Sequence, residues 1–432
     1  MSRPLYLTSE KSGLGVSAVL ILTLSLIFLQ EGFTYYISFQ VLALGTIAIL
    51  IFSTNHAIKI EMHTLVAFLV FTVFVAITAF FSPAVISQNS SNVLNRSIGI
   101  LGYAVMIGFL PHLKIKRAGL ILHVLKSVSS ATILVLVGLL ALSESNLVPS
   151  LNRASMVLQN SRLIDNESDP DAILDDQAVN LLIGQADRID LFYGEPSFLA
   201  IVLFTCLGCF MLTSKLLAYV SNRSNYNDLK LSFKSHESII FISIISLLYI
   251  QSFSSIIYAL VVIYFKFINI KIRRVNLLTS ISLLIVFAVA FLTFSYEYFL
   301  FRVTQSDSLS FIQRFGFVFD LGIIDLLFGI KDASKLLNGG INNGIFYVIA
   351  ISGFGGILYL VSLFYSVFTL STPIKSSLFM VLLVLSILMQ NGGIFSPSKV
   401  VLISLVLLPL ACARTIYSGQ HVASVNNGRR YG

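Results

Sequence analysis

The sequence has few charged residues. Only 11% of its 432 residues are Asp, Glu, Lys or Arg, whereas soluble domains carry about 25%. Hydrophobic residues make up 56% of the chain. This shortage of charge excludes an ordinary water-soluble domain and predicts a protein that lies in a membrane.

Cysteine is scarce as well. The three cysteines, Cys206, Cys209 and Cys412, all fall within apolar runs, so no disulfide framework is expected. Cys206 and Cys209 are one helical turn apart, a spacing that also occurs in redox and metal sites. Inside an apolar run this spacing is more typical of helix packing, and we expect neither a metal site nor a cofactor.

Long apolar runs recur along the chain, and with their flanks most approach the roughly 20 residues that a membrane-crossing helix needs. These runs are expected to be helices, because lipid offers the backbone no hydrogen-bond partner. We predict one all-α polytopic membrane domain over residues 1–432. Its twelve spans are 14–29, 33–53, 64–82, 97–113, 118–142, 196–214, 238–251, 253–269, 276–296, 343–370, 374–391 and 397–415.

Charge is unevenly divided between the two sides that these spans define. The side with both termini holds eighteen basic and four acidic residues, whereas the opposite side holds nine basic and sixteen acidic residues. Loops rich in Lys and Arg face the cytoplasm. Both termini are therefore predicted to be cytoplasmic.

Two long loops, 143–195 and 298–342, lie on the outer side. The first contains an acidic stretch, Asp165–Gln177, that lacks the apolar content to fold alone. The second contains Ser308–Gly329, which is apolar but interrupted by three charged residues. We predict an interfacial or re-entrant helix there, because a span would bury those charges.

The outer side lacks histidine, because all six histidines fall in or near cytoplasmic segments. Catalysis by an outer histidine is thereby excluded. No Asp or Glu lies in the middle of a predicted span, so the usual proton relay of a coupled pump is also missing.

The outer side does have one carboxylate at a helix start and several arginines. Glu195 and Pro196 fall in the first turn of a predicted span, where they favour helix initiation. Glu195, partly shielded by neighbours such as Tyr193, is equally suited to accept a proton from an alcohol. Planar arginine side chains match phosphate oxygens, although each arginine can instead form an ion pair. The candidates are Arg188, Arg302 and Arg314.

Further polar residues gather near the outer ends of spans. Asn342 and Asn343 precede a span, where they can cap the helix or bind sugar hydroxyls. Gln390 and a serine-rich hairpin around Ser252 indicate a hydrated pocket. Alternatively, these polar residues serve only the structure of the hairpin. The glycine-rich run Ser352–Gly356 is typical of close helix packing.

Four short motifs resemble the Wzy-type O-antigen polymerases, which form a superfamily with the O-antigen ligases. The motifs are GEPS at the end of Arg188–Ser197, QRFG to LLFG over Gln313–Gly329, Asn342–Leu358, and QNGGIFSP over Gln390–Pro397. An arginine followed by a glycine eleven positions later, described for some members, is not present after Arg314. The ligase branch is expected to use a histidine in the second outer loop, and its absence here favours the polymerase.

The resemblance implies a multi-pass protein of the bacterial inner membrane with a periplasmic active site. Its substrates would be undecaprenyl-pyrophosphate-linked oligosaccharides, polymerised during lipopolysaccharide biosynthesis without a nucleotide sugar. It implies that Arg188 and Arg314, and then Arg302, bind pyrophosphate, with Glu195 as the candidate base. Tyr193, Gln390 and the two asparagines are candidate substrate-binding residues.

Two alternatives remain open: a ligase that transfers finished polymer to lipid A-core, and a flippase or exporter of the lipid-linked oligosaccharide. A flippase would need a cationic central cavity, whereas the basic residues here lie in loops and at span ends. Expected partners are membrane lipids, and a chain-length regulator and a flippase of the same pathway. Nucleic acid is not an expected partner.

Overall fold

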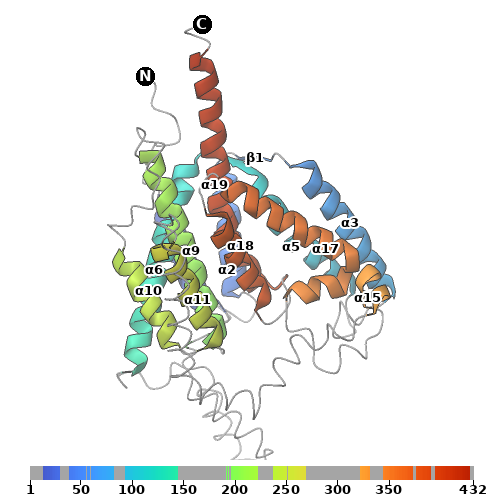
Figure 1. Cartoon of the computed structure of the whole chain (residues 1–432), viewed down its shortest axis with the longest axis horizontal. Helices are drawn as coiled ribbons and strands as arrows, with labels where there is room; N and C mark the ends of the chain where they lie inside the picture. Colours follow the sequence, from blue (N-terminus) through green and yellow to red (C-terminus); the bar gives the residue numbers. More distant parts are fainter. Residues whose placement is uncertain are drawn as a thin grey trace, which may run out of the picture.

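The computed structural model describes part of the chain in detail. The described residues are 13–29, 38–54, 56–58, 60–81, 93–144, 191, 193, 196–221, 237–250, 252–268, 322–330, 344–372, 376–390 and 395–428. Helices account for most of them (Figure 1). The expected all-α character is therefore confirmed at this coarse level.

Eleven of the twelve predicted spans coincide with a helix, and the twelfth, 276–296, lies outside the described residues. Five helices are long and apolar enough to cross a membrane by length and composition: α3 (Met62–Phe81), α6 (Ala118–Glu144), α9 (Pro196–Ser221), α17 (Gly344–Ser371) and α19 (Pro397–Gly428). Shorter apolar helices fill the other positions: α1 (Gly13–Ile27), α2 (Phe39–Ser53), α5 (Val93–Phe109), α10 (Glu237–Tyr249), α11 (Phe253–Ile263) and α18 (Ser377–Met389).

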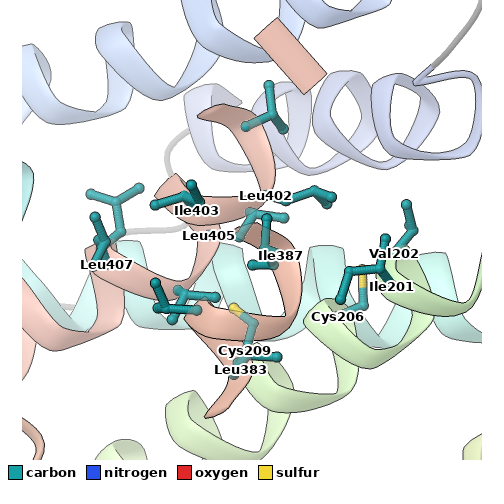
Figure 2. Close-up of a cluster of buried hydrophobic side chains, with 14 of the residues drawn as sticks. Ile201, Val202, Cys206, Cys209, Leu383, Ile387, Leu402, Ile403, Leu405 and Leu407 are labelled. Atoms are coloured by element: carbon teal, nitrogen blue, oxygen red, sulfur yellow. The ribbon is translucent and has the colours of Figure 1, made fainter. Parts of the chain in front are cut away.

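The centre of the bundle consists of α9 and α19. In the most apolar stretch of each helix, 94% of α9 is buried, 83% of α19 and 28% of α3. A helix that is apolar all round belongs in an interior, and α3 with its exposed apolar face belongs at the periphery. The cysteines pack in this centre, and all three thiols are buried and free. Cys209 lies near Leu383 of α18, and Cys206 lies beside Ile201 and Val202 of α9 (Figure 2).

A two-stranded antiparallel sheet is the feature that the sequence did not predict. Strand β1 (His56–Ile58) follows α2, and β2 (Leu113–Ile115) follows the 3-10 turn η2 (Leu110–His112); Ala57 pairs with Lys114. Both strands lie in connections between helices, where backbone groups need partners outside a helix. Their pairing brings two connections of the same predicted side together.

Side-chain contacts assign the helix ends to two groups. At the sheet end, Lys215 of α9 donates to Ser376 before α18, and Glu237 of α10 pairs with Lys266 in the π-helical turn η4 (Tyr264–Ile268). The other end, here the Gln390 end, contains the start of α9, the α10–α11 turn and the α18–α19 turn. From α1 to α11, and again from α17 to α19, successive helices thus run in alternating directions, as membrane spans do.

The second predicted outer loop contains one described helix, α15 (Ile323–Phe328), beside α3 and α17 (Figure 1). Its side chains Ile323 and Ile324 are exposed, whereas Phe328 stacks on Phe74 of α3. The predicted interfacial or re-entrant helix has its described counterpart in these six residues.

Candidate functional site

The predicted site residues divide into two sets. Tyr193 and Gln390 belong to the described residues. Outside the described residues lie Arg188, Glu195, Arg302, Arg314, Asn342 and Asn343. The site is therefore built here from the elements that flank these positions.

Polar side chains meet at the α18–α19 turn, in the Gln390 end of the bundle. Gln390 ends α18, and its side-chain amide donates to the Tyr258 hydroxyl of α11 at 2.6 Å. The Lys399 ammonium, in the first turn of α19, donates to the Gln390 carbonyl at 2.5 Å. Tyr258 in turn stacks on Phe204 of α9, with ring centroids 4.6 Å apart. Two hydrogen bonds thus join α18, α11 and α19, and a ring stack adds α9.

The described residues of this turn, Gln390 and 395–399, lie deep in the bundle. Helix α18 has only thirteen residues, a length of about 20 Å, whereas the apolar core of a bilayer is about 30 Å thick. Phe395 of the turn packs on Phe71, near the middle of α3, with ring centroids 5.8 Å apart. Irregular backbone at such depth occurs where it is enclosed by protein or lines a polar cavity.

Lys399 is the site residue that sequence analysis missed. Its side chain is only 1% exposed, although a buried ammonium is costly unless it is hydrogen-bonded. Its position in a first helical turn also places a cation near the positive end of the helix dipole. The sequence does contain a signal for this residue, since Lys399 follows a helix-starting proline by two positions. The charge balance treats Lys399 only as a basic residue of the outer side.

Tyr193 lies in the segment that enters α9, two residues before Glu195. Its ring is almost fully buried against Phe198, and its hydroxyl donates to the Leu26 carbonyl of α1 at 2.8 Å. Burial raises the pKa of Tyr193 well above its ordinary value, so the phenol stays a donor. This geometry favours an anchoring role, and substrate binding by Tyr193 stays a prediction.

The same segment contains a strained residue. Leu191 is buried and has φ 49°, a left-handed conformation that costs a non-glycine residue about 1–3 kcal/mol. Such strain persists where surrounding contacts impose it and is often found at functional sites. The described residues directly before Glu195 are thus held firmly against the bundle.

The second outer loop is fixed to a break in α17. Helix α17 has a non-helical residue, Gly353, with φ 50° and ψ −128°. Near this break the Ile330 amide donates to the Ala350 carbonyl at 2.9 Å, and Thr78 of α3 donates to the Phe328 carbonyl at 3.0 Å. A Cβ at Gly353 would lie 2.5 Å from the Leu327 carbonyl oxygen. The glycine-rich run therefore permits close packing, as predicted.

Among the described residues, no group of three His, Cys, Asp or Glu side chains could hold a metal ion. Comparison of the chain with protein-family models, with curated proteins and with solved structures found no match.

Proposed function

We propose that the chain polymerises undecaprenyl-pyrophosphate-linked oligosaccharide repeat units by glycosyl transfer at the periplasmic face of the bacterial inner membrane. The observation that carries this proposal is the polar turn from Gln390 to Lys399. A reaction on a lipid-linked sugar needs polar groups within the membrane-embedded bundle, and the buried polar side chains of this turn support the proposal.

The described parts of the family-like motifs support the proposal by their proximity. The GEPS motif continues into α9, whose Phe204 stacks on Tyr258, the partner of Gln390. The LLFG motif ends at Gly329 against α17, and Phe395 of the QNGGIFSP motif contacts Tyr359 of that same helix. Segments that are separated by up to two hundred residues thus converge on one end of the bundle.

The proposed chemistry is a displacement at the anomeric carbon of the donor. A hydroxyl of the acceptor repeat unit forms the new glycosidic bond, the bond to the pyrophosphate oxygen breaks, and undecaprenyl pyrophosphate leaves with the electron pair. Glu195 accepts the hydroxyl proton. Arg188 and Arg314, with Arg302 second, neutralise the leaving group, and this electrostatic stabilisation is the largest contribution expected from the protein.

A deletion strain tests the function through its surface polysaccharide. Loss of a polymerase leaves the acceptor capped with a single repeat unit. Uncapped acceptor with stored lipid-linked polymer would instead identify a ligase, and single repeats trapped in the cytoplasm a flippase. A full ladder of polymer lengths in the deletion strain would refute all three functions.

The site is tested by restoring that strain with variants. Glu195→Gln, Glu195→Ala and Arg314→Ala should abolish the ladder while the protein still reaches the membrane, because each removes a charge that the displacement uses. Lys335→Ala removes a positive charge from the outer loop that contains Arg314. It is the matched control and should restore the full ladder. Wild-type ladders from the Glu195 and Arg314 variants would assign these residues to helix initiation and ion pairing.

A further inference from the structure

A second polar cluster lies at the sheet end, about halfway along α19 from the Gln390 turn. It joins Glu61 before α3, His63 in α3, His112 in η2 and Arg414 in α19, and we name these four residues the histidine lock. Arg414 bonds Glu61 through Nη2 at 3.0 Å and His112 Nδ1 through Nη1 at 3.0 Å. His63 Nδ1 lies 3.5 Å from the other Glu61 oxygen.

Neutral hydroxyl groups complete the surroundings of the two imidazoles. Thr64 Oγ1 lies 2.9 Å and Ser366 Oγ 3.3 Å from His112 Nε2. Ser366 Oγ is also 3.5 Å from His63 Nε2, and the Tyr365 ring packs edge-on against His63. The lock therefore connects α3, η2, α17 and α19.

The hydrogen bonds fix the protonation state of His112. A guanidinium has only N–H donors, so His112 Nδ1 must offer its lone pair to Arg414. The imidazole proton is then on Nε2, where it is donated to Thr64. His112 is neutral in this arrangement, and its tautomer follows from its partners.

A second proton on His112 is incompatible with these contacts. It would occupy Nδ1, turn the acceptor into a donor, and place a positive charge 3.0 Å from the permanent charge of Arg414. Glu61 favours that proton, whereas Arg414 and a protonated His63 oppose it. The other charged residues of this connection, Lys114, Lys116 and Arg117, are exposed.

We propose that the histidine lock is a pH-sensitive device: protonation of His112 expels Arg414 and loosens the sheet end of α19 from η2 and α3. The other bond in this region, from the Ile115 amide to Thr415 Oγ1 at 2.9 Å, does not titrate and remains as a pivot. The inference is independent of the proposed polymerase function, since it concerns the coupling of helices in the chain alone.

The full chain in detergent micelles allows a direct test. The sequence has no tryptophan, so Tyr417→Trp, one turn beyond Arg414 and against Tyr219, gives a single fluorescent reporter. Acidification from about pH 8 to about pH 3, a range wide enough for a buried histidine to take up a proton, should shift its emission to the red as the helix end becomes hydrated.

The controls separate His112 from the other titrating groups. His112→Asn keeps an acceptor for Arg414 but cannot take a proton, so it should abolish the red shift; His112→Gln gives the same test if the first variant does not fold. His123→Asn, a histidine of α6 outside the lock, should leave the shift unchanged. A shift that persists in the His112 variants would overturn the proposal.

Discussion

At the scale of single residues, the buried hydroxyls of two tyrosines differ in their hydrogen bonds. Tyr193 donates to the Leu26 carbonyl, whereas the buried hydroxyl of Tyr249 has no hydrogen-bond partner in the described part of the chain. A hydrogen bond contributes about 0.5–1.5 kcal/mol net to stability, and an unpaired buried hydroxyl contributes nothing favourable.

Tyr193→Phe should therefore lower the free energy of unfolding by about 0.5–1.5 kcal/mol, because the Leu26 carbonyl loses its donor. Thermal unfolding of the full chain in detergent, followed by circular dichroism, measures the change. Tyr249→Phe is the matched control and should be neutral or slightly stabilising. Equal effects of the two substitutions would show that the Tyr193 hydroxyl does not anchor the segment before Glu195.

At the scale of elements, the contact between α15 and α17 depends on a missing side chain. Gly353→Ala adds a Cβ that would lie 2.5 Å from the Leu327 carbonyl oxygen, at a φ of 50° that alanine tolerates poorly. The substitution should destabilise the chain by more than about 1 kcal/mol. If the proposed site is correct, Gly353→Ala should also shorten the polysaccharide ladder, because α15 of the second outer loop would lose its contact with α17.

Gly45→Ala provides the comparison for this variant. A Cβ at Gly45, in α2, meets nothing within 4 Å, and alanine is the better helix former by about 0.5–1 kcal/mol. Thermal unfolding should rank Gly45→Ala at or above the wild type and Gly353→Ala below it. The reverse order would mean that α15 does not pack on α17 in solution.

Helices were predictable from the sequence, whereas contacts between distant residues were not. The apolar runs predicted spans at 343–370 and 397–415, and the structure has helices that begin at Gly344 and Pro397. Hydrophobicity determines such elements locally. The bonds of Arg414 to Glu61 and His112 join residues about three hundred positions apart, and no local pattern indicates them. The β1–β2 sheet was missed for the same reason, whereas Lys399 has a local signal, and only its burial depends on the fold.

At the scale of the whole molecule, the alternating helix directions constrain the path of the chain through the membrane. Helix α11 begins at the Gln390 end, near Tyr258, and the turn η4 that follows it reaches the sheet end, where Lys266 pairs with Glu237. Helix α15 and the start of α17 are back at the Gln390 end. The described elements on either side of residues 269–321 thus lie at opposite ends of the bundle.

We therefore predict that 276–296 is a span and that the sheet end faces the cytoplasm. An enzyme reporter that folds only outside the cytoplasm, because it needs disulfides, should be inactive when joined after Tyr417 and active when inserted between α6 and α9. Deletion of 276–296 should activate the reporter after Tyr417, since every later helix would reverse its direction, while the reporter between α6 and α9 stays active. If the reporter after Tyr417 stays inactive after that deletion, residues 276–296 are not a span, and packing alone determines the orientation of α19.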